Sequence, residues 1–344
     1  MKRIILLFAV FMFLAFSCSK NYSGTYTGYS WKDEAKGVPL EKATEKIETV
    51  LTLDKKGIIT DAKMLFYVMD KDGKWYTRQT DKAEVTVDFS VKPAAAVPQG
   101  KEQNYSAGKS MFTIQTADKM AFYSAAVNNE GTAALLIVEP FTRYQFEYRM
   151  DKGFDFSKKI KDLTIGSGMM VPTIRTSSGG YIKPDNWSKY ADHNIFSFYK
   201  DFYVLAGRGI LKGLNPDSTM KEMLERTGVS FSGNVPLPMD VKYGFTGIGG
   251  WEGNYRAITA YLKGKDAKSV KSLIDWNNPR YSGSISSDNF FGIDVKAGAT
   301  TTVQNSADGI AGASVRMSRE SASYQRALAS AGIIEEKDVI KGRF

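Results

Sequence analysis

Short segments that alternate apolar and polar residues follow one another over most of the first 166 residues, with turn sequences between them. Residues 47–53 are the clearest example, because every second side chain, from Ile47 to Leu53, falls on one face of an extended chain. The turn sequence Asp54-Lys55-Lys56-Gly57 follows at once. This succession predicts antiparallel hairpins. It favours a sheet-rich architecture over a helical bundle, in which apolar residues would recur every three to four positions.

Five more strands are expected in the same part of the chain, and the chain is apolar enough, at 43% hydrophobic residues, to bury them in a core. The segment from Lys92 to Gly100 contains two prolines and a glycine, so it is predicted to be a loop. The expected strands are residues 84–89, 110–115, 120–127, 133–139 and 144–149.

Residues 167–233 differ in composition and are expected to form an aromatic and helical connecting region. A short helix is predicted here, with Asn215 as its N-cap and Pro216 in its first turn. Met220, Met223 and Leu224 stand at helical spacing, and Gly228 is the expected stop. Several aromatic residues around Trp187 follow no regular period. Aromatic side chains in a sheet-rich protein usually belong to the core, so core packing is favoured over a ligand site.

Residues 234–344 are expected to form a separate carboxy-terminal unit. Residues 254–262 and 270–276 are predicted to be two strands of a hairpin, with the turn at Lys263-Gly264-Lys265. A helix is predicted from an N-cap at Ser318 to a stop at Gly332. The expected fold is therefore α+β, with a β-rich amino-terminal domain at residues 18–166, the connecting region, and a unit of β-hairpins with a terminal helix at residues 234–344.

The amino terminus has the pattern of an export signal. Met1-Lys2-Arg3 is positively charged, and the 13 apolar residues from Ile4 to Phe16 are too few to span a bilayer, which needs about 20. Residues 1–17 are therefore predicted to be a signal peptide. The end of this segment, Leu14-Ala15-Phe16-Ser17-Cys18, resembles a bacterial lipobox. The resemblance implies that Cys18 is lipidated and anchors the exported chain at the periplasmic or extracellular face of a bacterial membrane.

The chain contains one cysteine and one histidine, which limits its chemistry. A single cysteine excludes an intramolecular disulfide, and His193 alone is too little for a zinc site, so no metal centre is expected. No catalytic triad is expected either, because residues 190–195 lack a nucleophile motif. The net charge of +9 comes from scattered lysines and arginines, so no nucleic-acid partner is expected.

A turn of small residues precedes the predicted terminal helix. It reads Asp308-Gly309-Ile310-Ala311-Gly312-Ala313-Ser314. Glycine and alanine leave the Ser314 hydroxyl room to approach a phosphoryl group. The free N–H groups at the start of a helix favour the negative charge of a phosphate. The pattern therefore indicates a hydroxyl placed to receive or bind a phosphate, although such a turn can also serve only to start the helix.

This turn resembles the motif of the bacterial FMN-binding domain family, which includes FMN-carrying subunits of the Rnf complex and of the sodium-pumping NADH:quinone reductase. In that family a flavin transferase splits FAD and attaches FMN through its phosphate to a threonine. The resemblance implies that Ser314 is the acceptor, with Asp308, Gly312 and Ala313 matching the motif. The chain departs from the motif at Ala311, where the family has serine or threonine, and in having serine as the acceptor.

Two functions remain open from the sequence. In the first, the protein is a lipid-anchored extracytoplasmic electron-transfer flavoprotein, rather than a substrate-converting enzyme, and covalent FMN exchanges electrons with donors or acceptors in the membrane. Arg316 is then a candidate partner of the flavin phosphate, although a solvated surface charge is the alternative. In the second, the protein is a lipid-anchored module that binds a ligand or partner without flavin.

Overall fold

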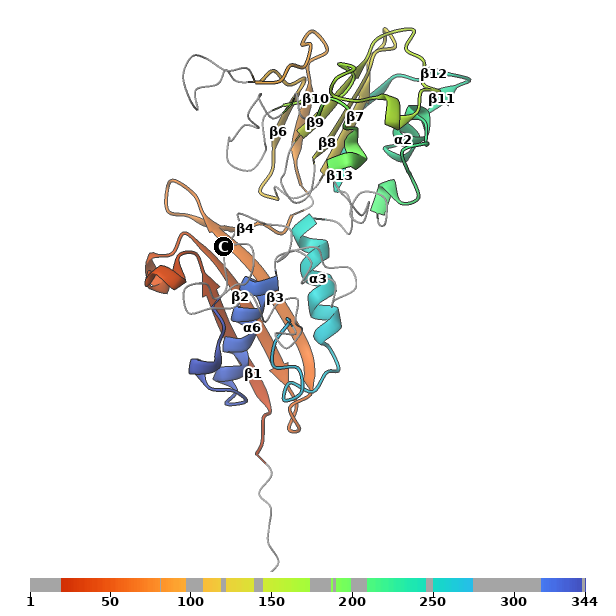
Figure 1. Cartoon of the computed structure of the whole chain (residues 1–344). Helices are drawn as coiled ribbons and strands as arrows, with labels where there is room; N and C mark the ends of the chain where they lie inside the picture. Colours follow the sequence, from red (N-terminus) through yellow and green to blue (C-terminus); the bar gives the residue numbers. More distant parts are fainter. Residues whose placement is uncertain are drawn as a thin grey trace, which may run out of the picture.

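The computed structural model describes residues 20–80, 82–96, 108–118, 122–138, 145–173, 187, 190–198, 209–245, 250–274, 317–341 and 344. Within these ranges the chain has a four-stranded and a five-stranded antiparallel sheet, which lie in different parts of the molecule (Figure 1). Helices pack on both sheets, so the predicted α+β class is confirmed.

The four-stranded sheet has the order β1-β2-β3-β4 and comes from one continuous stretch of chain. Its first hairpin turn is the predicted one, in which the Asp54 carboxylate accepts hydrogen bonds from the backbone N–H groups of Lys56 and Ile58, both at 2.8 Å. Gly57 has φ +89°, a left-handed conformation that suits glycine. The strands are β1 (Gly24–Trp31), β2 (Glu45–Leu53), β3 (Ile59–Met69) and β4 (Trp75–Thr77).

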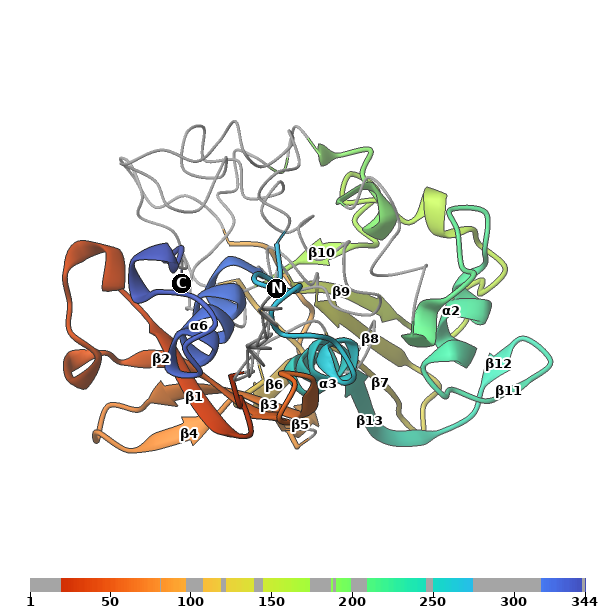
Figure 2. The same cartoon turned by 90° about the horizontal axis from the view of Figure 1, so that it is seen from below.

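Two helices from the far end of the sequence cover one face of this sheet. Helix α6 (Met317–Ser330) lies on β1 and β2, and α3 (Gly250–Leu262) lies on β3 (Figure 2). The face of β2 that was predicted from residues 47–53 is the buried one. It shares a single apolar core with Trp251, Ile258 and Leu328 of the two helices.

The five-stranded sheet has the order β10-β9-β8-β7-β13, and its central strands are buried on both faces. One face packs against α2 (Met220–Arg226) and the segments around it, and the other packs against the hairpin of β5 and β6. All five strands expected between residues 84 and 149 are present. The strands are β5 (Glu84–Val87), β6 (Phe112–Gln115), β7 (Phe122–Val127), β8 (Ala133–Val138), β9 (Gln145–Met150), β10 (Val171–Pro172) and β13 (Met239–Phe245), with a small separate pair, β11 (Phe231–Ser232) and β12 (Val235–Pro236).

The aromatic side chains of the connecting region that lie within the described ranges belong to the core, as expected. The Trp187 ring lies 6.5 Å from the ring of Phe146 on β9, and Phe196 is buried in the same cluster. Helix α2 is present, but the predicted start at Asn215 and Pro216 is wrong, because the helix begins at Met220. Its N-cap is Thr219, whose hydroxyl accepts from the Glu222 N–H at 3.2 Å while the Glu222 carboxylate accepts from the Thr219 N–H at 2.6 Å.

The predicted strand at residues 254–262 is wrong, because this segment is the greater part of α3. Its apolar residues extend the helical spacing of Trp251, Tyr255, Ile258 and Leu262, all of which are buried. The described part of the expected return strand, residues 270–274, contains no strand. The terminal helix is confirmed, but it begins at Met317, so Ser318 lies inside it and is not its N-cap.

The grouping of the elements also differs from the expected carboxy-terminal unit at residues 234–344. Strand β13 joins the five-stranded sheet beside β7, whereas α3 and α6 share their core with strands of residues 45–69. The two halves of the expected unit therefore pack on different sheets. A helix pattern in the sequence shows that one face must be buried, but it does not say which sheet buries it.

Candidate functional site

The residues predicted to carry the function lie outside the described ranges. This applies to Cys18 and to Asp308, Gly312, Ala313, Ser314 and Arg316. The structure does describe the helix after the motif, because α6 begins at Met317, three positions beyond Ser314. The surroundings of this helix start are therefore the part of the candidate site that can be built from contacts.

The first turns of α6 are polar and yet buried. Ser318, Arg319, Glu320 and Ser321 are all at most 8% exposed. Backbone and side-chain bonds fix their position: the Ser30 hydroxyl donates to the Arg319 carbonyl at 2.6 Å, and the Leu273 N–H donates to the Ser321 hydroxyl at 3.1 Å. Burying so many polar groups at a helix start is costly unless they have partners, and these hydrogen bonds supply partners within the fold.

Two arginines meet over the same aromatic rings at this place. The Arg319 guanidinium carbon lies 5.0 Å from the Phe66 ring centre and 4.9 Å from that of Trp251. The Arg78 guanidinium carbon lies 4.5 Å and 6.0 Å from the same two rings. We call Arg78, Arg319, Phe66, Trp251 and Phe344 the arginine–aromatic cluster, since the Phe344 ring also lies 5.8 Å from Arg319.

Acidic groups balance part of this positive charge. Glu320 accepts from Arg319 Nε at 3.0 Å and from the Tyr255 hydroxyl at 2.9 Å, both on Oε1. Arg78 faces Glu45 at 3.5 Å. Lys32 approaches the same carboxylate at 2.9 Å. Among the described residues, three cations thus share two carboxylates, and positive charge is in excess there.

The pKa values of these groups reflect their burial and their mutual contacts. Burial raises the pKa of Glu320, and Arg319 opposes that rise. Burial alone would lower the pKa of Arg319, but the attraction of Glu320 raises it overall. Burial lowers the pKa of Arg78, and the neighbouring Arg319 lowers it further while Glu45 opposes the change. The arginines remain charged, so the cluster is a fixed positive site.

Two buried atoms beside the cluster have no hydrogen-bond partner among the described residues. They are the Trp251 indole Nε1, a donor, and Glu320 Oε2, an acceptor. Such groups are uncommon in folded proteins, because leaving one unpaired costs about 1–3 kcal/mol. The cluster thus combines an unpaired donor, an unpaired acceptor and guanidinium groups that lie on aromatic faces.

The sequence alone did not indicate this cluster. Its members come from separate parts of the chain. Phe66 lies in β3 and Arg78 follows β4, whereas Trp251 lies in α3, Arg319 lies in α6 and Phe344 follows α6. No sequence motif singled out Arg78, Trp251 or Arg319. No local spacing links residues that far apart, so only their meeting in the fold reveals the site.

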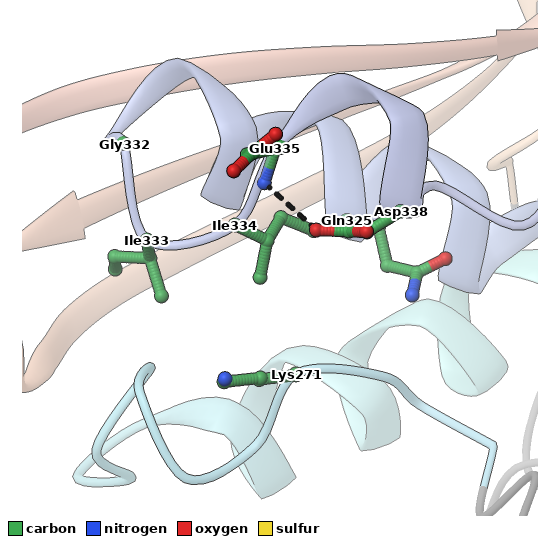
Figure 3. Close-up of a pocket in the computed structure, with 7 residues that line it drawn as sticks. All are labelled: Lys271, Gln325, Gly332, Ile333, Ile334, Glu335 and Asp338. Carbon is green, nitrogen blue, oxygen red and sulfur yellow. Dashed lines mark hydrogen bonds between the residues drawn. The ribbon is translucent and has the colours of Figure 1, made fainter.

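A pocket of about 530 Å³ lies at the other end of α6, and it is a weaker candidate (Figure 3). Its polar groups already have partners: Gln325 accepts from the Ile340 N–H at 3.0 Å, and Asp338 accepts from the Glu335 N–H at 3.2 Å. The residues that line it are Lys271, Gln325, Gly332, Ile333, Ile334, Glu335 and Asp338.

A second buried carboxylate, Glu147 on β9, has a structural role. Burial raises its pKa to about 7, and three hydrogen bonds oppose the rise. They come from the Ser110 hydroxyl, from the Met111 N–H at 3.0 Å and from the Thr173 hydroxyl at 3.1 Å. Glu147 thereby joins three separate segments of the sheet region, and its oxygens are fully used.

Within the described ranges, no three His, Cys, Asp or Glu side chains gather as a metal site would require. None of the helices there combines the length and the apolar character needed to cross a bilayer. No protein-family model, curated protein or solved structure matches the chain.

Proposed function

We propose that the protein is an exported, lipid-anchored flavoprotein that carries FMN on Ser314 and transfers electrons. The observation that carries the proposal is the position of the small-residue motif, three residues ahead of a helix whose first turn is buried beside the arginine–aromatic cluster. The unpartnered Trp251 Nε1 and Glu320 Oε2 support it, because a flavin ring offers both acceptors and a donor.

In the attachment step, the Ser314 hydroxyl oxygen attacks the FMN phosphorus of FAD within the flavin transferase. A phosphoester bond forms, the pyrophosphate bond breaks, AMP leaves, and the hydroxyl proton passes to a base of the transferase. Gly312 and Ala313 keep the approach open, and Asp308 orients the turn or helps to hold the transferase's metal. Arg316 pairs with the phosphate that results.

Bound FMN supplies the redox chemistry, and the protein supplies retention and charge. Covalent attachment is useful outside the cytoplasm, where a dissociated cofactor would be lost. The guanidinium groups of Arg78 and Arg319 stack on aromatic rings within the fold and provide fixed positive charge beside the first turn of α6. Donors or acceptors in the membrane are the proposed electron-transfer partners.

The flavin assignment predicts a covalent adduct of defined mass. After export with an active flavin transferase, the intact mass should rise by one FMN less water, and Ser314→Ala should abolish the increment completely because the attacking oxygen is gone. Ser314→Thr restores a hydroxyl and should keep it. Ser306→Ala, which removes a nearby hydroxyl, serves as the control.

An adduct that persists in Ser314→Ala would move the attachment site to another hydroxyl. Absence of an adduct and of bound flavin in the unmodified protein would contradict the flavin function. That result would favour the alternative of a lipid-anchored binding module.

The lipid anchor predicts that Cys18→Ala releases the protein from membranes. The thioether to the lipid can form only on cysteine, so after a wash with concentrated salt the variant should be almost entirely in the soluble fraction, as measured by immunoblotting. The wash removes protein held only by charge. Ser17→Ala keeps a small residue before Cys18 and should stay in the membrane fraction; retention of Cys18→Ala there would place the anchor elsewhere.

A further inference from the structure

Lysines from three separate segments meet where β1 begins. Tyr22 lies at the centre: the ammonium groups of Lys20 and Lys268 lie 5.2 Å and 5.7 Å from its ring centre, and its N–H donates to the Lys55 carbonyl at 3.3 Å. The start of β1, the β2–β3 turn and the carboxy-terminal end of α3 lie at the same end of the molecule (Figure 1). We call Lys20, Lys55, Lys56, Lys265 and Lys268 the lysine end.

The contacts within the lysine end are short and involve backbone atoms, so the lysines are held together by the fold. Lys268 Nζ donates to the Lys56 carbonyl at 2.8 Å, and Lys20 Nζ donates to the Gly332 carbonyl at 2.7 Å. The Ile59 N–H donates to the Lys265 carbonyl at 2.9 Å, which ties the segment after α3 to β3. All five lysines are exposed.

The charge of this end is strongly positive. Residues 20–23, 54–57 and 263–271 contain seven lysines and two aspartates. The Asp54 carboxylate accepts two backbone N–H groups of its own turn, and Asp266 accepts the Lys268 N–H at 3.0 Å and lies 3.7 Å from the Lys268 ammonium. Asp61 pairs with Lys263 at 2.9 Å, so the excess positive charge comes from the remaining lysines. Two further acidic residues, Glu335 and Asp338, follow α6 in the chain and line the pocket of Figure 3 together with Lys271.

We propose that the lysine end binds the anionic phospholipid surface of the membrane to which the protein is anchored. The proposal rests on the lipid anchor of the proposed function, because Lys20 follows Cys18 by two residues and this end of the fold must therefore lie close to the lipid. Clustered lysines add electrostatic attraction to anionic headgroups, and a lipid chain with a basic patch holds a protein more firmly than one chain alone.

Contact between the lysine end and the bilayer sets the orientation of the molecule relative to the membrane. Gly332, which Lys20 contacts, follows the last turn of α6, and the helix runs away from it for 14 residues to Met317, a length of about 20 Å. The arginine–aromatic cluster, which contains Arg319 near the Met317 end of α6, is thus held on the side away from the bilayer. A protein docked in this way presents its candidate redox site to partners that project from the membrane or are free in solution.

Vesicle binding of the unlipidated chain tests the proposal. The mature chain expressed from Ser19 onward should sediment with vesicles of equal parts phosphatidylglycerol and phosphatidylcholine, and should not sediment with phosphatidylcholine alone. Binding should fall as salt is added. A triple variant, Lys55→Gln with Lys56→Gln and Lys265→Gln, should bind roughly a hundredfold more weakly.

The matched control removes three exposed lysines elsewhere, with Lys71→Gln, Lys152→Gln and Lys212→Gln, and should bind as the unmodified chain does. Equal losses in the two triple variants would show that net charge alone is responsible and would overturn the proposal, as would the absence of binding to anionic vesicles. Because the protein used here has neither lipid nor flavin, these outcomes are independent of the Cys18 and Ser314 experiments.

Discussion

Replacing Gly28 by valine should destabilise the protein by about 3 kcal/mol or more, because helix α6 lies directly against the backbone of β1 at this residue. A Cβ atom on Gly28 would overlap the Ala327 nitrogen and the Ser323 carbonyl oxygen, which are backbone atoms and cannot rotate aside. The helix would have to move outward, which would also break the bond between Ser323 and Thr49, 2.7 Å long.

Urea unfolding, followed by circular dichroism, measures this loss as a lower transition midpoint. Gly28→Ala should already show part of it, which covers the case in which the valine variant fails to fold. Thr25→Val, an exposed position on the opposite face of β1, is the control and should leave the midpoint nearly unchanged. A midpoint for Gly28→Val equal to that of the control would contradict the close approach of α6 to β1.

Replacing Arg319 by methionine should cost about 3–5 kcal/mol of stability at neutral pH, because it leaves the Glu320 carboxylate buried without its cation. Arg319 is 8% exposed and Glu320 is 0% exposed, so water cannot take over the missing contact. The cost should depend on pH. Without Arg319 the pKa of Glu320 rises further above its usual value, so the penalty is small where the carboxyl is protonated in both states and grows as the pH rises.

The double variant Arg319→Met with Glu320→Gln separates this cause from a loss of packing. It should recover most of the stability and lose most of the added pH dependence, because no uncompensated charge remains and the Tyr255 hydroxyl can still donate to the amide oxygen of the new glutamine side chain. Lys36→Met, which breaks an exposed ion pair with Asp33, is the control and should change little. A penalty for Arg319→Met that is the same at every pH would indicate lost packing instead.

The sequence by itself determined the local elements whose signals lie within a few residues. The alternation from Ile47 to Leu53 identified the buried face of β2, and Asp54 with Gly57 identified the turn, because side-chain periodicity and turn chemistry act over short distances. The spacing of Met220, Met223 and Leu224 located α2 for the same reason. The strand predicted at residues 254–262 is a helix, because its apolar residues continue the helical spacing that begins at Trp251, outside the predicted strand.

Only the tertiary structure decided which elements share a core and which polar groups meet. Gly28 and Ala327 are 299 positions apart in the chain, and so are not linked by any local pattern, yet their contact brings α6 onto β1. The same packing places Arg319 and Arg78 on the rings of Phe66 and Trp251. The apolar face of a helix shows only that this face must be buried. The element that buries it is determined by the shape complementarity of two complete surfaces, which no short stretch of sequence specifies.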